Sequence, residues 1–295
     1  MPPTWLEVAL NGAWTRAAQP RIPVSVDEII ADGIACVRAG AAIVHLHAYD
    51  AATGRQKDDV ELYARIIEGI RAKVDAIVYP TVKGFTPAGA ELSLMGPERY
   101  EAVLGLAERG LLEWSVVDPG SINLATYHDI ARDRPGTVYM NPQSDVCIGL
   151  AMAERHGFHP SYAIYEPGFL RLGAALAARY PKLKTPIYRF MFSKQFTFGF
   201  PPRDYALDTY VTMMREYAPN APWMIAGLMS DVTPLIAKTV ALGGHVRTGL
   251  EDVRLGCERS NVELVDAAAR DIVRAGGTPA TAAQVRAALA QLRAT

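Results

Sequence analysis

The sequence predicts an α/β fold, a (β/α)8 TIM barrel formed by a single domain over residues 1–295, with insertions around its catalytic mouth. Short runs of β-branched and apolar residues alternate with longer helical patterns along the whole chain, and eight of these runs are typical strands. A chain of somewhat under 300 residues has the length that eight strand–helix units need. A doubly wound open sheet is the alternative, because periodicity does not show whether a sheet closes. No GxGxxG motif follows the first run, which argues against a dinucleotide-binding sheet.

The first half of the chain supplies four strands. A first strand is expected at 6–10, and the helix after it begins near Ser25, whose hydroxyl can cap it, with Asp27 and Glu28 in the first turn. Gly40 ends this helix. The remaining elements are a strand at 42–47, a helix at 60–73, a strand at 76–81, a helix at 97–109 that starts with a proline, and a strand at 114–117.

The second half supplies the other four strands, with helical stretches between them. They are expected at 161–165, 186–192, 223–226 and 245–249. A further run at 137–140 falls inside the long connection after the fourth strand, so we interpret it as an added ribbon. This ribbon and the segment 85–96 are the predicted insertions around the mouth of the barrel.

Composition and charge argue against several classes of partner. The formal net charge is -1, which gives no electrostatic reason to expect nucleic acid or an anionic membrane surface. The three cysteines form no CxxC pair, which fits a reducing cytoplasm and argues against a thiolate zinc site. The N-terminus has no signal-peptide pattern, and no apolar run reaches the roughly 20 residues that span a bilayer. We therefore expect a soluble cytoplasmic protein without nucleic-acid or membrane partners.

His45 and His47 are the strongest candidates for metal ligands. Residues two apart in a strand point to the same face, and this pair ends the strand at 42–47, where a barrel places its catalytic rim. Two neutral imidazoles so placed can bind one zinc ion side by side. The alternative is a hydrogen-bonded pair of histidines in the barrel interior. Glu251, at the end of the last strand, can complete a His2Glu site with an open position, although Glu251 and Asp252 also fit a helix N-cap.

Several motifs together resemble the β-keto acid cleavage enzymes. They are GAAIVHLHAYD at 40–50 followed by TGR at 53–55, DPGSIN at 118–123, WMIAG at 223–227, GGHVRTGLED at 243–252 and SNVELV at 260–265. The resemblance runs from residue 6 to about residue 270. The pairing of HLH with GGHVRxGLED is specific, well above a single short motif.

The resemblance implies a (β/α)8 barrel, a homotetramer and a zinc-dependent reaction. In that reaction a β-keto acid and acetyl-CoA give acetoacetate and a new acyl-CoA. The implied ligands of one zinc per subunit are His45, His47 and Glu251. Asp252 corresponds to the general base, and Arg247 would stabilise a carboxylate or oxyanion. Two further positions, Thr81 and Ser121, are candidate hydroxyl donors to the substrate, and either could instead be a turn residue.

The chain departs from the family pattern where an ammonium group would bind. Trp14 and Ala163 stand where two glutamates hold that group, so we predict a β-keto acid that lacks a primary ammonium. Trp14 could bind a quaternary ammonium through a cation–π contact, or simply pack. Tyr49 replaces a common arginine. Lys83 replaces a glycine and could pair with a distal carboxylate or a CoA phosphate, or could be a solvated lysine.

Two other classes of function remain open. One is a metal-dependent aldolase or hydrolase on the same barrel, which would use metal-bound water and no CoA. The other is a binding protein that has lost catalysis, which the intact set of polar residues argues against. Among the other histidines, His128, His156 and His159 are expected at the surface, and His245 is expected to be structural.

Overall fold

Eight parallel strands form one sheet in the computed structural model, which describes residues 2–84 and 96–292. Their order in the sheet is β5-β2-β1-β12-β11-β10-β9-β6. Their bounds are β1 (Leu6–Ala9), β2 (Ile43–Leu46), β5 (Ile77–Pro80), β6 (Trp114–Val116), β9 (His159–Ile164), β10 (Ile187–Phe192), β11 (Trp223–Gly227) and β12 (His245–Thr248). The outer strands β5 and β6 contact each other, so the sheet nearly closes into a barrel. The predicted (β/α)8 fold is confirmed.

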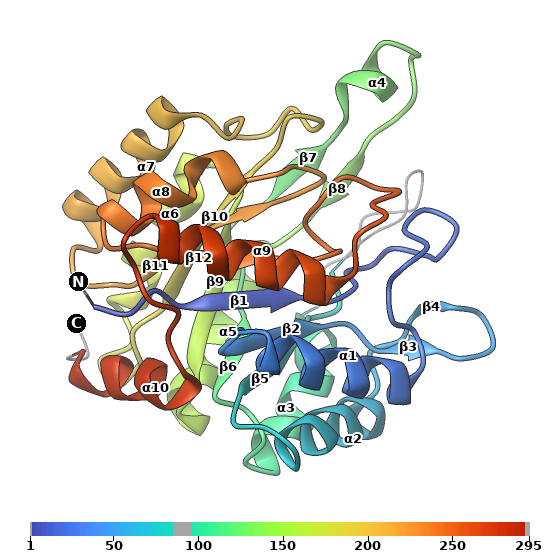
Figure 1. Ribbon diagram of the computed structural model, residues 1–295. Helices are drawn as coiled ribbons and strands as arrows, with labels where there is room; N and C mark the ends of the chain where they lie inside the picture. The colour runs from blue at the N-terminus through green and yellow to red at the C-terminus, as the bar shows by residue number, and fades with distance from the viewer. Residues whose placement is uncertain (1, 85–95, 293–295) are drawn as a thin grey trace.

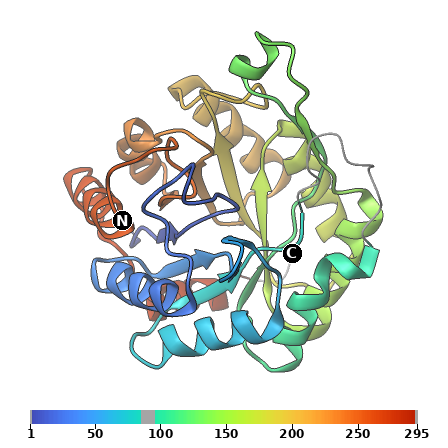
Figure 2. The same ribbon diagram turned by 90° about the vertical axis from the view of Figure 1, so that its right-hand side faces the viewer.

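Helices surround the strands, as the view into the barrel in Figure 2 shows. Their bounds are α1 (Val26–Arg38), α2 (Val60–Arg71), α3 (Glu101–Glu108), α5 (Gln143–His156), α6 (Pro167–Ala177), α7 (Asp204–Tyr217), α8 (Ile236–Ala241), α9 (Asn261–Arg274) and α10 (Ala282–Gln291), with a short 3-10 helix η2 (Thr233–Leu235) before α8. The predicted cap of α1 is confirmed, because Ser25 and Glu28 form a reciprocal capping box.

Two predicted elements differ in detail from the structure. The helix expected at 97–109 is a 3-10 turn, η1 (Gly96–Tyr100), followed by α3, so its proline lies in the 3-10 turn and not at the start of an α-helix. The strand expected at 161–165 begins earlier, at His159, because His159 already pairs with Trp114 of β6. Element ends of this kind depend on pairing with distant strands, which a local pattern does not contain.

Two additions extend from the mouth of the barrel. The ribbon predicted at 137–140 is confirmed as β8 (Thr137–Tyr139), which pairs antiparallel with β7 (Ile122–Leu124) outside the barrel sheet, and α4 (Tyr127–Ile130) lies at its tip. The other addition is a hairpin of β3 (Tyr49–Asp50) and β4 (Arg55–Gln56). Of the insertion predicted at 85–96, residues 85–95 lie outside the described residues.

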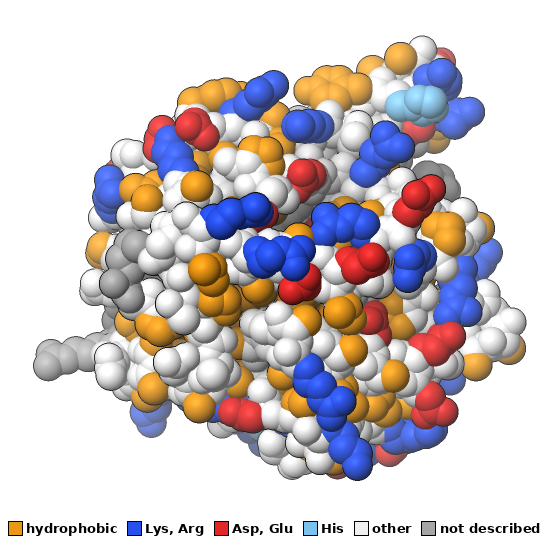
Figure 3. All heavy atoms as spheres, in the orientation of Figure 1, with side chains coloured by type: hydrophobic (Ala, Val, Ile, Leu, Met, Phe, Trp, Pro, Cys, Tyr) orange, Lys and Arg blue, Asp and Glu red, His pale blue; other side chains and the backbone are white. Residues whose placement is uncertain are grey.

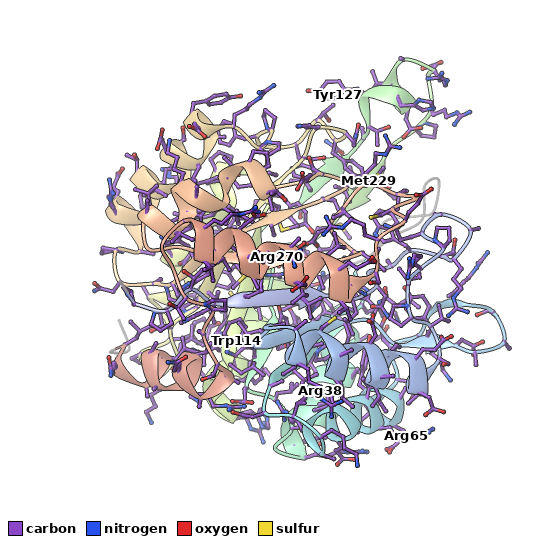
Figure 4. The ribbon with its side chains drawn as sticks, in the orientation of Figure 1. Arg38, Arg65, Trp114, Tyr127, Met229 and Arg270 are labelled. Atoms are coloured by element: carbon purple, nitrogen blue, oxygen red, sulfur yellow. The ribbon has the colours of Figure 1, made fainter. Side chains whose placement is uncertain are left out.

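The mouth and the chain termini lie at opposite ends of the barrel. In Figure 1 the hairpin and the β7–β8 arm are on the right, and both termini are on the left. Trp114 is fully buried inside the barrel, whereas Tyr127 projects from the arm with 64% of its surface exposed (Figure 4). The carboxyl ends of the strands therefore open toward the additions, as the barrel fold requires of a catalytic face.

The surface mixes charges of both signs. Figure 3 shows basic and acidic side chains interspersed on one face, in keeping with the formal net charge of -1. Within the described ranges, no helix combines the length and the apolar character needed to cross a bilayer.

Candidate metal centre and active site

His45, His47 and Glu251 converge at the mouth of the barrel and form what we call the ligand cluster. Glu251 Oε2 lies 3.5 Å from His45 Nε2 and 3.6 Å from His47 Nε2. One ligand atom from each residue fits within a 4.8 Å span. A tetrahedral zinc ion with bonds of about 2.0 to 2.1 Å sets two ligand atoms about 3.3 Å apart. The observed spacings are too long for hydrogen bonds and close to those of a shared metal ion.

Unpartnered atoms support this fit. Among the described residues, His47 Nε2 and Glu251 Oε2 are buried without a hydrogen-bond partner. Buried polar atoms are nearly always paired, so a pair of such atoms facing each other calls for a missing partner. A divalent cation is the partner that accepts lone pairs from both atoms. The residues present therefore fit a His2Glu metal site.

The backbone of His47 is held by one side chain from the loop after β1. Asn11 Oδ1 accepts a hydrogen bond from the His47 amide (2.9 Å), and Asn11 Nδ2 donates to the His47 carbonyl (3.0 Å). The same Nδ2 also donates to the carbonyl of Pro23 (3.0 Å). This amide side chain continues the pairing of β1 with β2 past the last strand residues, and it fixes the end of β2 where the histidines project.

The ring of His47 is oriented by Gln56 of the β3–β4 hairpin. His47 Nδ1 lies 2.8 Å from Gln56 Oε1, and Gln56 Nε2 donates to Asp58 Oδ1 (2.9 Å). Because an amide oxygen only accepts, Nδ1 carries the proton and Nε2 keeps its lone pair for a metal. Burial holds the pKa of His45 well below its usual range, so the ring of His45 is neutral and able to ligate.

Glu251 is placed by glycines that allow close approach of β12 and β1. Gly249 has φ +143°, and a Cβ there would lie 2.1 Å from the carbonyl oxygen of Ala9. Gly12 has φ +62°, and a Cβ there would lie 2.7 Å from Glu251 Cγ. From the same loop, Trp14 Nε1 donates to the Glu251 carbonyl (2.9 Å). A side chain at position 249 would therefore clash with the backbone of β1, and one at position 12 would clash with the Glu251 side chain, so both positions require glycine.

Arg247 is fully buried and joins three carboxylates. Nη2 donates to Glu251 Oε1 (2.7 Å) and Asp252 Oδ1 (2.8 Å), Nε donates to Asp252 Oδ2 (3.0 Å), and Nη1 donates to Glu7 Oε1 (3.2 Å). Tyr79 donates to the same oxygen of Glu7 (2.7 Å). Burial opposes ionisation of Glu251, but the buried Arg247 guanidinium beside it holds its pKa well below the usual range. Arg247 thus turns Oε2 of an ionised Glu251 toward the histidines.

Asp252 lies behind Arg247. Burial raises the pKa of Asp252 to about 6, and Arg247 opposes that rise. Its side chain faces a second space between β12 and α9, and Arg247 is the residue that borders both this space and the cavity of the ligand cluster. Asp252 therefore does not line the cavity of the ligand cluster. Its contact with a residue of the cavity wall is the pair of hydrogen bonds from Arg247.

A cavity of about 300 Å³ opens in front of the ligand cluster. Trp14, Thr81, Ala163 and Arg189 are among the described residues that line it. Ser121 is exposed and is not one of those residues, and its hydroxyl accepts a hydrogen bond from the amide of Asn141 (2.7 Å). Of the two hydroxyls predicted to contact substrate, the structure therefore brings only that of Thr81 to the cavity.

Two departures predicted to matter at the mouth have different surroundings. Tyr49 is buried, and its hydroxyl donates to the carbonyls of Gly12 (2.5 Å) and Trp14 (2.9 Å), so it holds the loop that supports Glu251. Lys83 is exposed. It does not line the cavity within the described part of the chain.

Three residues of the site were not predicted from the sequence patterns. Asn11 and Gln56 position His47, and Arg189 places a buried guanidinium at the cavity wall. The arginine in an otherwise apolar strand, at 186–192, was a signal for the last of them. The expectation that His159 lies on the surface is wrong, because this residue is half-buried at the start of β9 and donates to the Thr185 carbonyl.

Comparisons with known proteins identify relatives of this chain. A family model described as beta-keto acid cleavage enzyme matches residues 3–290. A 3-oxoadipate:acetyl-CoA acetyltransferase of Cupriavidus necator is 30% identical, covering 97% of this chain and 94% of its own. A 3-keto-5-aminohexanoate cleavage enzyme of Fusobacterium nucleatum is 26% identical, covering 92% of each chain.

The solved structures add support for the fold. The apo structure of ObcA superposes with a TM-score of 0.71 at 17% identity, covering 92% of this chain, which spans 66% of ObcA. At this identity the likeness concerns the fold alone. The family model, by contrast, covers nearly the whole sequence, and the chain belongs to the β-keto acid cleavage enzyme family.

Proposed function

We propose that this protein cleaves a β-keto acid in an acetyl-CoA-dependent reaction that gives acetoacetate and a new acyl-CoA, with one divalent metal ion, zinc by preference, in each subunit. The observation that carries the proposal is the ligand cluster, whose unpartnered atoms face one another at an open cavity. Family membership supports the reaction class, and a relative named for transfer with acetyl-CoA supports the co-substrate.

His45, His47 and Glu251 would hold the metal. When bound, the ion supplies a Lewis acid that polarises the keto group of the substrate and makes the C–H between its two carbonyls more acidic. The chain's own contribution is to hold neutral imidazoles and an ionised carboxylate in place before substrate arrives. Burial of His45 and the contact of Arg247 with Glu251 both favour those states.

We assign the role of general base to Asp252, and we assign to Arg247 the role of orienting that base and stabilising its charge. Asp252 does not line the cavity, so the proton would reach it by way of Arg247, whose guanidinium would pass an N–H proton to the Asp252 carboxylate as it takes up the proton of the substrate. Burial raises the pKa of Asp252 and makes it more basic than an exposed aspartate. Arg247 donates to both oxygens of that carboxylate, so it orients the base and balances the charge that changes during transfer. Thr81, which lines the cavity, is our candidate hydroxyl donor to the substrate.

We further propose that the substrate lacks a primary ammonium group. Trp14 and Ala163 line the cavity, and they stand at the two positions where the family resemblance places the glutamates that hold such a group. The carboxylates among the described lining residues are Asp118 and Glu251. Glu251 belongs to the ligand cluster, and Asp118 accepts hydrogen bonds from Tyr139 (2.6 Å) and the Ala163 amide (2.7 Å). An ammonium group would therefore be buried without a free partner.

The first test combines substrates with one variant. Zinc-loaded protein is incubated with acetyl-CoA and a panel of β-keto acids, and new acyl-CoA is followed by mass. The Asp252→Asn protein should lose roughly 10²–10⁴-fold in kcat because it lacks the base. Its zinc content, measured by elemental analysis, should stay at that of the wild type.

The outcomes separate the competing functions. Turnover that needs no acetyl-CoA would favour a metal-dependent aldolase or hydrolase. Equal activity on 3-keto-5-aminohexanoate and on substrates without ammonium would contradict the proposed specificity. A His45→Ala protein with full zinc occupancy and full rate would show that the metal assignment is wrong. The homotetramer inferred from the resemblance stays a prediction.

A further inference from the structure

Arg189 is a buried guanidinium at the cavity wall that makes no hydrogen bond to the described residues. Its side chain is 3% exposed and lines the cavity. Nε has no hydrogen-bond partner among the described residues, and the described carboxylate within 4.0 Å of the guanidinium is Asp118, whose Oδ1 lies 3.9 Å from Nη2. That distance is too long for a hydrogen bond. A buried cation without hydrogen bonds to its nitrogens is costly, so an anion is expected to complete it.

The nearby groups do not fill this role. Asp118 is engaged by the amide of Ala163 and the hydroxyl of Tyr139, which hold its two oxygens. Glu7 also acts on Arg189 electrostatically, but its hydrogen bonds are with Arg247 and Tyr79. Arg247, the other arginine of the described cavity wall, differs because it donates to three carboxylates. Arg189 is therefore the cavity arginine with unused donor capacity in the described part of the chain.

The residue next to Arg189 leaves space in front of it. Ala163 of β9 is paired in register with Arg189 of β10, and both residues line the cavity. A larger acidic side chain at 163 would lie beside the guanidinium and neutralise it. With alanine there, the positive charge faces the cavity.

The strand order places Arg189 across the barrel from the histidines. His45 is on β2 and Arg189 is on β10, and in the order β5-β2-β1-β12-β11-β10-β9-β6 these two strands are four apart. In a ring of eight strands, four apart is diametrically opposite. A ligand with one end at the ligand cluster can therefore direct its other end to Arg189.

We propose that Arg189 selects a β-keto acid that carries a second carboxylate at the end remote from the keto group. This inference rests on the proposed function, since it assumes that the reacting end lies at the ligand cluster. A carboxylate matches the planar donor fork of arginine and would bring the anion that the buried cation lacks. The phosphates of CoA are a poorer match, because Arg189 is buried at 3% exposure and belongs to the cavity wall.

The test uses substrate pairs of equal length with acetyl-CoA and zinc-loaded protein. They are 3-oxopentanedioate with 3-oxopentanoate, 3-oxohexanedioate with 3-oxohexanoate, and 3-oxoheptanedioate with 3-oxoheptanoate. For at least one pair, the wild type should prefer the dicarboxylate in kcat/KM. The Arg189→Gln protein should lower that ratio roughly 100-fold, as expected for removing one partner of a buried charge pair. Arg189→Lys should keep part of the preference.

A second variant controls for the chance that Arg189→Gln loses its substrate preference through a folding defect. Ala163→Glu leaves the arginine in place and adds a carboxylate beside it, so the same ratio should fall. KM for acetyl-CoA should stay within a few-fold of the wild type in both variants. A change confined to the KM for acetyl-CoA would assign Arg189 to the co-substrate and overturn the inference.

Binding separates failure of this inference from failure of the proposed function. Calorimetry with hexanedioate and hexanoate, which lack the keto group, should show tighter binding of the dicarboxylate to the wild type and no such preference in Arg189→Gln. Turnover of β-keto acids with no dicarboxylate preference overturns the inference and leaves the proposed function standing. Absence of all turnover, together with an Arg189-dependent preference in calorimetry, contradicts the proposed function and supports the anion subsite.

Discussion

At the scale of single residues, the two histidines of the ligand cluster are held by different forces. The ring of His47 is fixed by a hydrogen bond to Gln56, which Asp58 fixes in turn. The ring of His45 packs against Tyr79 with centroids 4.7 Å apart, and its Nδ1 has no partner within the described residues. The orientation of His47 therefore depends on the β3–β4 hairpin, whereas that of His45 depends on the barrel interior.

We predict that Gln56→Leu weakens metal binding without removing a ligand. The variant loses the acceptor that holds the proton on Nδ1 of His47, so Nε2 is no longer kept free and the ring can turn. Loss of such a partner lowers metal affinity roughly 10–100-fold. Competition with a chromophoric chelator measures the affinity. Arg55→Ala, an exposed residue of the same strand β4, is the control and should bind metal as the wild type does. Equal affinities for wild type and Gln56→Leu would show that the hydrogen bond has no influence.

Residue patterns predict ligands better than they predict the residues that hold ligands. The spacing of His45 and His47 is local, because alternation along one strand puts both side chains on one face. Gln56 and Asn11 reach His47 from other segments, and nothing in their own neighbourhood requires a polar residue. The resemblance implies that Arg247 stabilises a carboxylate or oxyanion, and this role stays a prediction. In the structure Arg247 donates to Glu251, Asp252 and Glu7, and Glu7 lies beside it because β1 pairs with β12.

At the scale of elements, the loop after β1 is the support of the metal site. It supplies the amide of Asn11 to His47 and the indole of Trp14 to the Glu251 carbonyl. Gly12, between them, passes close to Glu251 in a left-handed conformation. The hydroxyl of Tyr49 donates to the backbone of this loop and so ties the loop to the β3–β4 hairpin.

We predict that Gly12→Ala lowers metal affinity through a steric effect on Glu251. The new Cβ would lie 2.7 Å from Glu251 Cγ, so the carboxylate must move away from the histidines. Gly110→Ala is a matched control, because Gly110 has φ +68° against +62° at Gly12 and nothing lies within 4 Å of its added Cβ. Both variants should lose about 1–2 kcal/mol of unfolding free energy from the strained φ. Chelator competition should show weaker zinc binding in Gly12→Ala alone; equal weakening in both would attribute the effect to backbone strain.

Elements with local signals were predictable, and those with distant partners were not. The capping box at Ser25 lies within four residues, so the start of α1 follows from sequence. The start of β9 is set by its pairing with β6, which is distant in sequence. The short β3–β4 hairpin is set by the pairing of its two strands at the mouth. Neither pairing leaves a strong periodic signal in so few residues.

At the scale of the whole molecule, barrel closure assembles one site from opposite ends of the chain. β1 pairs with β2 on one side and with β12 on the other, so Glu7 lies beside Arg247 and Ala9 lies beside His45. The alternation of eight strands and helices predicts that β1 lies between β2 and β12. It does not predict the register of strand pairing, which decides which residues are in contact. The same closure stacks His245, the first residue of β12, on Trp5, just before β1, with ring centroids 4.0 Å apart, so the pair lies at the amino-terminal ends of these strands.

Burial of His245 is expected to make the stability of the barrel depend on pH. Burial lowers the pKa of His245 to about 3, and its Nδ1 accepts a hydrogen bond from the Trp5 amide (3.1 Å), which requires the neutral ring. In the unfolded chain a histidine has a pKa of about 6.5. Below that pH the unfolded state binds a proton that the folded state excludes, so unfolding is favoured as the pH falls toward 3. Above about pH 6.5 both states are neutral and the effect vanishes.

We predict that His245→Asn removes this part of the acid sensitivity. Asparagine can still accept from the Trp5 amide but does not titrate, although loss of the stacked ring should make the variant less stable at pH 7.5. On lowering the pH to 5.0, the wild type should lose about 2 kcal/mol more than the variant, from 1.5 pH units at about 1.4 kcal/mol each. Urea unfolding at both pH values, with chelator present so that metal release does not contribute, measures the difference. His128→Asn alters an exposed histidine and should parallel the wild type. A constant gap between His245→Asn and the wild type at the two pH values would mean that the ring accepts a proton in the folded barrel, and that the stack on Trp5 tolerates the charge.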